Sequence, residues 1–150
     1  MDAKLYVIGG FSDGSYLSDC EVLDLSQPDR GFTRLIHDLP CALSSLAVVA
    51  REHWIYVLGG YTGIEDHFDT VLALDTRTLE WDDTLPTLKE NRHMPTLFVW
   101  GDQLVVAGGR SCDRHGRVQY LKSAEILNLV SGATEWTPML DMPLPRAGAV

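Results

Sequence analysis

The feature that most constrains this chain is an apolar segment that ends on two adjacent glycines and occurs three times. The segments read KLYVIGG, IYVLGG and LVVAGG, and their second glycines, Gly10, Gly60 and Gly109, lie 50 and 49 residues apart. Because paired glycines weaken a strand through lost packing and extra chain entropy, three copies at one spacing indicate a repeated geometrical requirement. A period of this length is typical of propeller blades or solenoid units.

Other residues keep the same register as the glycine pairs. The segment YLSDCEVLDL at 16–25 matches YLKSAEILNL at 120–129, and an aromatic residue and a Leu-Pro or Met-Pro follow in each unit. Another apolar stretch lies between that proline and the next glycine pair in the first two units. The short apolar runs, rich in Val, Ile and Leu and broken by Gly, Pro, Asp and Asn, favour strands over helices. The sequence therefore predicts an all-β fold in which each unit is a β-propeller blade of four antiparallel strands.

The composition excludes several classes of protein. The chain has 150 residues, 45% of them hydrophobic, which suffices for a substantial core. Its formal net charge of −9 argues against binding to nucleic acid or an anionic membrane, because both need a basic face. We find no membrane span and no signal peptide pattern. Cys20, Cys41 and Cys112 lack CxxC spacing, so we expect buried or half-buried thiols in a reducing, cytoplasmic setting.

The glycine pairs, the later tryptophans and the Pro-Arg of PLPRAGAV together resemble the kelch repeat, three times along the chain. The resemblance implies blades whose strands are named a to d outward from the axis, with the glycine pair ending strand b. It also implies roles such as a substrate adaptor or a cytoskeletal scaffold. The sequence departs from the family pattern at Leu23 and Leu74 in place of tyrosine, at Phe32 in place of tryptophan, and at Leu43 where the other units have Arg92 and Arg146.

The glycine register predicts one kelch-propeller segment, 1–150, with repeats at about 1–42, 43–91 and 92–150. Three blades form an incomplete ring, because propellers have about four to eight blades. Uncovered sheet faces and strand edges then invite association. Two ways of closing the ring stay open: further blades from the same longer chain, or a homodimer in which residues 146–150 of each copy supply the missing strand a of the other.

Strand parity places the b–c and d–a connections on one face of the propeller and the a–b and c–d turns on the other. The predicted b–c loops are 11–18, 61–69 and 110–119, and the third has an insertion of four or five residues. Binding usually occurs at variable loops on a rigid scaffold. Arginines there can hold carboxylates or a phosphate, or can instead offset acids of adjacent loops. The predicted partner-binding residues are Phe11, Tyr61, Arg92, Arg110, Arg114, His115, Arg117 and Arg146.

Some of these residues also have a structural interpretation. Arg92 and Arg146 start strands a, a position that in similar kelch domains often lines the ligand-binding mouth, but either could pair with an acid of a neighbouring blade. The glycines are expected to permit close backbone approach and the aromatic residues to pack between blades. These structural residues are Gly9, Gly10, Gly59, Gly60, Gly108, Gly109, Phe32, Trp81 and Trp136.

No catalytic site, metal site or cofactor is predicted. The five histidines fall in different loops without HxH or HExxH spacing. The acidic loop that contains Glu65, Asp66, His67 and Asp69 is expected to be solvated. We therefore expect a non-enzymatic protein-interaction module that binds a peptide or protein, acidic in its contact segment, through the b–c and d–a loops. The alternative is part of a kelch-fold enzyme of the sugar-mutarotase or copper-oxidase type.

Overall fold

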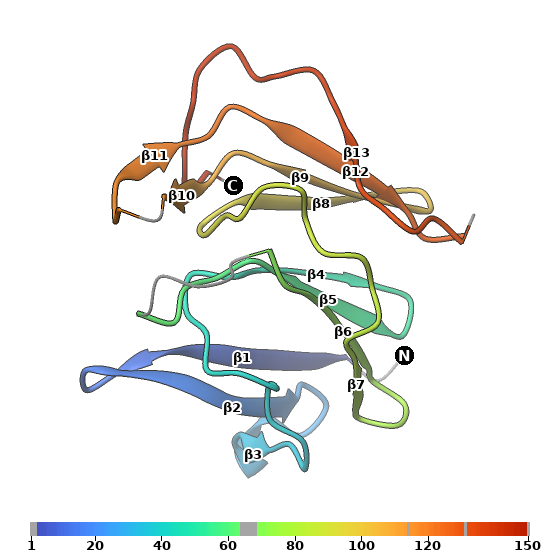
Figure 1. Ribbon diagram of the computed structural model, residues 1–150. Helices are drawn as coiled ribbons and strands as arrows, with labels where there is room; N and C mark the ends of the chain where they lie inside the picture. The colour runs from blue at the N-terminus through green and yellow to red at the C-terminus, as the bar shows by residue number, and fades with distance from the viewer. Residues whose placement is uncertain (1–2, 64–68, 114, 131, 150) are drawn as a thin grey trace.

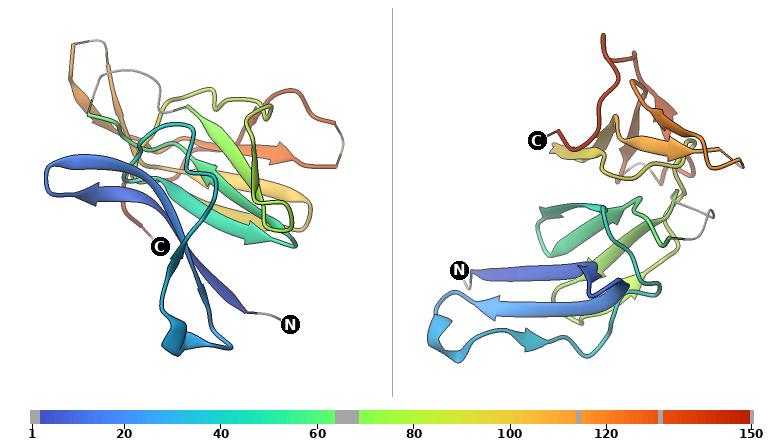
Figure 2. Two further views of the ribbon diagram at one scale, coloured as in Figure 1. Left: turned by 90° about the horizontal axis from the view of Figure 1, so that it is seen from below. Right: turned by 90° about the vertical axis from the view of Figure 1, so that its left-hand side faces the viewer.

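Three antiparallel sheets stand side by side in the computed structural model, which describes residues 3–63, 69–113, 115–130 and 132–149 (Figure 1). The first and third sheets lie at opposite ends of the stack, and the second lies between them, as Figure 1 and the right-hand view of Figure 2 show. The described sheets form no closed ring. Within the described residues, no helix is long and apolar enough to cross a membrane.

The first sheet has three strands in the order β1 (Lys4–Ser12), β2 (Ser15–Asp24) and β3 (Thr33–Arg34), with a short 3-10 helix, η1 (Pro28–Arg30), before β3. A two-residue turn, Asp13 and Gly14, joins β1 to β2 with φ of 50° and 81°. Positive φ at both residues is the turn geometry that matches the twist of a hairpin. The predicted loop at 11–18 is therefore wrong, because the two strands continue to this Asp-Gly turn.

The second and third sheets have four strands each, which confirms the all-β prediction of four-stranded antiparallel blades. In both sheets the strands follow the predicted order a to d, whereas the first sheet contains b, c and d. An additional hairpin occupies most of the predicted loop at 110–119. The second sheet comprises β4 (Ala47–Arg51), β5 (Trp54–Leu58), β6 (Val71–Asp75) and β7 (Glu80–Asp82); the third comprises β8 (Thr96–Trp100), β9 (Gln103–Ala107), β12 (Ala124–Asn128) and β13 (Thr137–Pro138); and the hairpin comprises β10 (Arg110–Cys112) and β11 (Val118–Tyr120).

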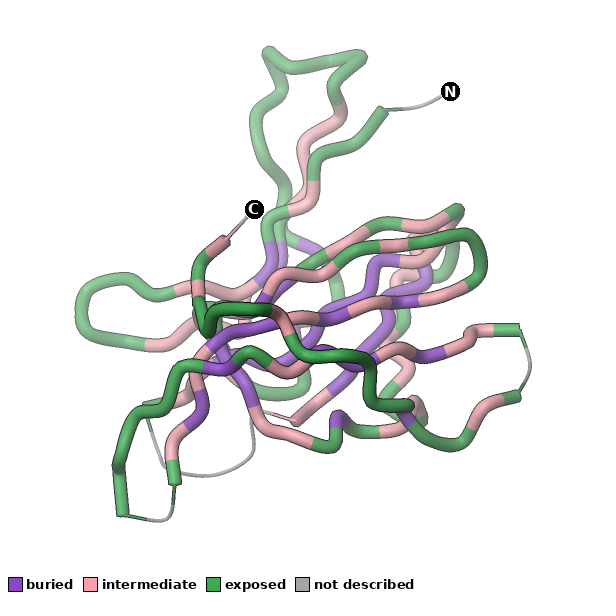
Figure 3. Tube along the Cα trace, turned by 90° about the horizontal axis from the view of Figure 1, so that it is seen from above, coloured by how far each residue is buried: buried purple, intermediate pink, exposed green. Residues whose placement is uncertain are grey.

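An apolar core fills each of the two spaces between successive sheets. Figure 3 shows that the buried residues gather in the middle of the molecule, whereas the projecting loops are exposed. Alternate residues of β5 point to opposite faces, so Val57 belongs to the first core and Tyr56 to the second. Trp136 is fully buried in the second core, and Trp81 packs against the first. Phe32 differs from the expected packing between blades: it is 47% exposed, because no described sheet lies beyond it.

The glycine pairs lie where the chain leading to the next sheet passes closest to the preceding one. A Cβ on Gly9 would lie 2.6 Å from the Leu43 carbonyl oxygen, and one on Gly108 would lie 2.5 Å from that of Arg146. Both glycines also have positive φ, so the position excludes a side chain in two ways. The N–H of the second glycine donates a hydrogen bond to the same segment, from Gly10 to Leu43, Gly60 to Arg92 and Gly109 to Arg146, at N···O distances of 2.8, 3.2 and 2.8 Å.

A second set of backbone hydrogen bonds links the sheets beside their inner strands. Ser45, Met94 and Gly148 all have left-handed φ, at 56°, 55° and 65°. The Met94 N–H donates to the Ser45 carbonyl at 2.7 Å, and the Gly148 N–H donates to the Met94 carbonyl at 2.8 Å. Gly148 therefore lies beside the third sheet in the way that Met94, which precedes β8, lies beside the second. The strand exchange between two copies that the sequence suggested stays a prediction.

Candidate partner-binding surface

The described parts of the three b–c connections lie on one side of the molecule, at the left of Figure 1, and the β4–β5 and β8–β9 turns lie at the right. We call the left side, formed by residues 11–16, 59–63, 110–113 and 115–120, the loop face. It carries most of the residues that the sequence predicted to bind a partner. Its geometry therefore decides which of them act together.

Four ring side chains form a continuous row along the loop face. The ring centroids of Phe11 and Tyr16 lie 5.0 Å apart, those of Tyr16 and Tyr61 5.5 Å, and those of Tyr61 and His93 5.3 Å. The first two pairs meet edge to face, which is a favoured geometry for aromatic rings. The row joins the first sheet to the segment that opens the third. We call these four residues the aromatic row.

Local backbone pairing places each ring of the row. Phe11 and Tyr16 are cross-strand partners on either side of the Asp-Gly turn. Tyr61 forms an isolated bridge with Ser44. A Cβ on Gly63 would lie 2.5 Å from the Tyr16 ring, so this ring rests on the backbone of the neighbouring loop. Burial, and next the neighbouring Tyr61, raises the pKa of the Tyr16 hydroxyl.

Arg110 stands at the end of the aromatic row, where its backbone pairs with that of His93. His93 is buried, and burial followed by the positive charge of Arg110 lowers the pKa of its imidazole. One terminal nitrogen of Arg110, Nη2, lies 3.3 Å from the Met94 sulfur. Its Nε has no hydrogen-bond acceptor among the described residues. A guanidinium has five N–H donors, so Arg110 retains donors for a ligand.

The prediction that Arg92 binds a partner is wrong, because its side chain is fully buried. Its Nη2 lies 2.6 Å from a carboxylate oxygen of Glu125, and its Nη1 donates to the carbonyls of Gly108 and Ser123 at 2.9 and 3.2 Å. Glu125 belongs to the same third sheet and not to a neighbouring blade. Arg92 therefore holds this sheet together and cannot meet a partner on the loop face.

The glycine-pair geometry and the sheet order agree with the comparisons with known proteins. The Kelch motif matches residues 1–28 and 42–83, which contain β1, β2 and the whole second sheet. Over these residues the chain belongs to the Kelch motif family. Its third sheet, outside that match, repeats the strand order of a kelch blade.

Two kelch relatives align with about half of the chain or less. A protein of Arabidopsis thaliana that carries the name F-box/kelch-repeat protein is 36% identical over 75 residues, which are 50% of this chain and 19% of the relative. Kelch repeat-containing protein 2 of Saccharomyces cerevisiae is 37% identical over 67 residues, 41% of this chain and 8% of the relative. The matched segments thus span less than a fifth of the length of either relative.

The described arginines fall into two groups, with and without a carboxylate partner. Arg117 on the loop face, Arg146 beside the third sheet and Arg30 in η1 are exposed, and none of them forms an ion pair with a described residue. Arg110 likewise has no carboxylate partner in the described part of the chain. Four other arginines each contact a carboxylate: Arg34, Arg51, Arg77 and Arg92.

The remaining predicted residues of the third kelch unit lie on or near the β10–β11 hairpin. The Asp113 carboxylate accepts hydrogen bonds from the backbone N–H groups of His115 and Arg117, at 2.8 and 2.9 Å, which closes the hairpin loop. His115 is exposed there. Arg114 lies outside the described residues, as does the acidic cluster Glu65, Asp66 and His67.

Sequence reasoning missed Tyr16 and His93 as members of the aromatic row. The signal for Tyr16 was present, because an Asp-Gly turn pairs the residues that flank it at equal distance, here Phe11 and Tyr16. His93 gave no local signal, since only the folded chain brings it to Tyr61. The described residues contain no group of three or more His, Cys, Asp or Glu side chains that could hold a metal ion.

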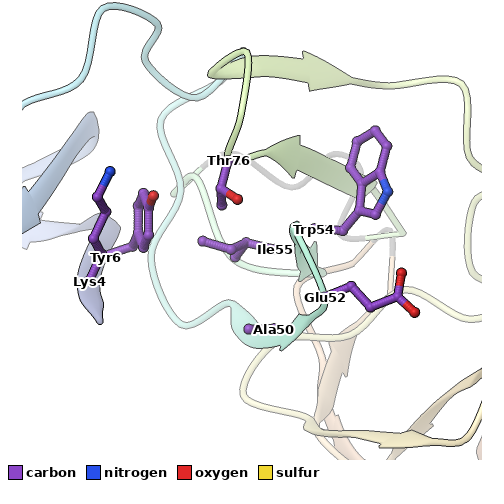
Figure 4. A pocket seen from close by; sticks show the side chains of 7 residues that line it. All are labelled: Lys4, Tyr6, Ala50, Glu52, Trp54, Ile55 and Thr76. Atoms are coloured by element: carbon purple, nitrogen blue, oxygen red, sulfur yellow. The ribbon is translucent and has the colours of Figure 1, made fainter. Parts of the chain in front are cut away.

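A hollow of about 290 Å³ lies away from the loop face, between β1 and the β4–β5 hairpin (Figure 4). Lys4 and Tyr6 on β1 stand across it from Glu52 and Trp54. It opens beside the edge of β1, where the other two kelch blades have an inner strand. No residue predicted to bind a partner lines it, so the loop face is the better candidate site.

Proposed function

We propose that the chain is a non-enzymatic protein-binding module that holds an acidic peptide segment on the loop face. The aromatic row supplies an apolar surface, and Arg110 at its end supplies a charged one. The name of the Arabidopsis thaliana relative combines F-box and kelch repeats. This favours a role as a substrate adaptor or scaffold, with protein partners, over catalysis.

The observation that carries the proposal is that the described arginines of the loop face, Arg110 and Arg117, lack a described carboxylate partner beside the aromatic row. In a chain with a net charge of −9, Arg110 and Arg117 have no carboxylate partner among the described residues. Surface arginines without a partner remain free to form bidentate hydrogen bonds with a carboxylate. Asp113, the nearest acid in sequence, uses its carboxylate on the backbone of its own loop.

The aromatic row suggests how a bound segment would be oriented. Phe11 is 57% exposed at one end, and the half-buried Arg110 lies at the other. Tyrosine and phenylalanine rings give large contact areas at a low cost in conformational entropy. A peptide that places an apolar side chain on Phe11 and Tyr61 would bring an acidic side chain to Arg110. Cys20 is buried and Cys112 half-buried, as expected, whereas Cys41 is exposed. A reducing cytoplasmic location for these free thiols belongs to the same proposal, as does the absence of a cofactor.

The test is binding of the full chain to synthetic peptides on an array. Each acidic peptide, rich in Asp and Glu around one apolar residue, is printed beside a matched peptide with Asn and Gln. We expect the wild type to retain acidic peptides, more weakly as salt increases, because exposed charge interactions are screened. The Arg110→Glu, Arg117→Glu double variant should lose at least about tenfold in affinity, since like charges then face each other.

The matched control is Arg30→Glu. Arg30 is exposed in η1, has no ion pair with a described residue, and lies in the connection between strands c and d, away from the loop face. This variant makes one of the same charge changes and should bind as the wild type does. Equal retention of acidic and amide peptides, or full binding by the double variant, would contradict the proposal.

A further inference from the structure

The buried pair of Arg92 and Glu125 marks two positions that the repeat supplies in every kelch unit. Position one is the residue whose carbonyl accepts the N–H of the second glycine: Leu43, Arg92 or Arg146. Position two is a residue of strand c. It lies opposite the residue of strand b that comes three places before the second glycine. The residues at position two are Glu21 opposite Val7, Leu72 opposite Val57, and Glu125 opposite Val106.

The two complete pairs are filled in compatible ways. In the third sheet, Arg92 and Glu125 form an ion pair, and both are buried. In the second sheet, Leu43 and Leu72 are 1% and 2% exposed and belong to one apolar core. A charge therefore faces its opposite, and an apolar side chain faces another.

Two charged residues remain without a counterpart from the repeat. Glu21 is exposed on the first sheet and forms no ion pair with a described residue. Its cross-strand neighbour Arg34 is held by Asp19 and Asp38 instead. Arg146 is exposed beside the third sheet, also without an ion pair there. The two residues are of opposite charge, and the first and third sheets beside which they lie form opposite ends of the stack (Figure 1).

The outer face of the first sheet has the residues of an interface between blades. Leu5 and Val7 occupy the places of Ile55 and Val57 in the second sheet. Ile55 and Val57 are 5% and 1% exposed, because the first sheet covers them, whereas Leu5 and Val7 are 46% and 43% exposed. Glu21 lies on this face, since it pairs with Val7.

The outer face of the third sheet has the complementary half of such an interface. Phe98, Val105 and Ile126 form a row across β8, β9 and β12. The corresponding row of the second sheet, Val49, Tyr56 and Ala73, packs in the core beneath the third sheet. Phe98 is nevertheless 58% exposed. Each end of the stack thus continues an interface that already exists twice inside the molecule.

We propose that two copies of this chain close into a ring of six sheets, in which Arg146 of each copy pairs with Glu21 of the other. The outer face of each third sheet then covers the outer face of the partner's first sheet. Six sheets fall within the range of closed propellers, and a contact between unlike ends forms a finite assembly when its rotation closes. One chain carries both charges of the pair, which is why the occupant is a second copy.

The ion pair does not depend on the strand exchange expected from the sequence. Gly148 and Ala149 are hydrogen-bonded to Met94 and Thr96, and Met94 is bonded in the same way to Ser45 of the unit before it. Strand exchange through residues 146–150 therefore stays a prediction, and the proposed contact needs only the side chain of Arg146. The inference does not depend on peptide binding, because none of its contacts uses the aromatic row.

The experiment measures the mass of the full chain by light scattering after gel filtration, over a range of concentrations. We expect twice the mass of one chain for the wild type. Arg146→Glu and Glu21→Arg should each weaken dimerisation about 100-fold, because each replaces two symmetry-related ion pairs by like charges, at about tenfold for each. Circular dichroism checks that the variants remain folded.

Two restored combinations make the test specific to this pair. The Arg146→Glu, Glu21→Arg double variant should dimerise again, and so should an equimolar mixture of the two single variants, since both ion pairs re-form in the mixed dimer. Arg117→Glu, the same change at another exposed arginine of the third unit, should leave the dimer intact. A monomeric or aggregating wild type, or single variants that dimerise as well as the wild type, would overturn the proposal. So would a failure of both combinations to restore the dimer.

Discussion

The second and third sheets fill the same place in the repeat in opposite ways. The third uses the ion pair of Arg92 with Glu125, and the second uses Leu43 with Leu72. All four side chains are at most 3% exposed. The comparison teaches that the space between these two positions must be filled and that any polar group in it must be paired. An ion pair meets this requirement in the third sheet, and two leucines meet it in the second. Apolar residues can often replace a buried ion pair without loss of stability.

The largest expected effect comes from removing one half of the charged pair. Glu125→Leu removes the carboxylate that lies 2.6 Å from the buried Arg92 guanidinium and leaves only that of Glu90, at 3.6 Å, so we expect the free energy of unfolding to fall by about 3 kcal/mol. Urea denaturation followed by fluorescence measures the change. Glu135→Leu removes the exposed partner of Lys89 and should cost less than about 1 kcal/mol. Equal losses in both variants would show that burial of the charge is unimportant.

Truncating the apolar pair should have the next largest effect. Leu43→Ala opens a cavity in the first core, and we expect a loss of about 2–4 kcal/mol. The same urea titration compares it with Leu25→Ala, whose leucine is 51% exposed and should change stability by less than about 0.5 kcal/mol. The comparison between the sheets fails if Leu43→Ala is as mild as Leu25→Ala.

The glycine pair is the feature that the blades share, and Gly108→Ala tests it. The left-handed φ of 64° costs an alanine about 1–2 kcal/mol, and its Cβ would also collide with the Arg146 carbonyl. Gly101→Ala has a similar φ of 58° but no atom within 4 Å, so it should lose only the first contribution. Comparing the thermal unfolding midpoints of the two variants separates the cost of the left-handed φ from the cost of the collision. If their midpoints coincide, the close approach contributes nothing.

Converting the third sheet to the chemistry of the second should have a smaller effect. The Arg92→Leu, Glu125→Leu double variant is expected to lie within about 1 kcal/mol of the wild type, far above Glu125→Leu alone. A urea titration of the wild type, both single variants and the double variant gives the coupling energy. Losses that simply add would mean that the charged pair is not interchangeable with leucines.

The smallest expected effect concerns the residue directly after Leu43 or Arg92. This residue is Ser44 in the second unit and His93 in the third. Because the pKa of His93 is lowered by burial and by Arg110, the unfolded chain binds the proton more readily. Its contribution is therefore neutral well above pH 6.5 and becomes destabilising as the pH falls below that ordinary value. His93→Ser should flatten the stability profile between pH 7 and pH 5.5. An unchanged slope would exclude His93 as its origin.

Local pattern in the sequence predicted much of the fold. The glycine pairs, the alternation of apolar residues and the turn residues depend on neighbours in the chain, so the strands b and the all-β fold could be read from them. The Asp13-Gly14 hairpin turn was equally local, although its interpretation as part of a longer loop was wrong. The repeat boundaries at about 1–42, 43–91 and 92–150 stay a prediction.

The candidate site was harder to predict, because contacts between distant segments decide it. Arg92 is buried only because Glu125, 33 residues later, lies within reach of its guanidinium. The aromatic row takes its rings from three separate segments, and Phe11 and Tyr61 were expected there without Tyr16 and His93 between and beside them. The roles of Arg110, Arg117 and Arg146 in binding stay predictions, and that of Arg114 falls outside the described residues.

The hydrogen bonds among Ser45, Met94 and Gly148 give the stack of sheets a polarity. Each N–H points back to the unit before it, so every successive blade is added in the same sense, as in a filament with distinguishable ends. Two like ends brought together would oppose carboxylate to carboxylate or guanidinium to guanidinium. Any further sheet must therefore join the stack through unlike ends. The direction of the backbone hydrogen bonds beside the inner strands already sets this order.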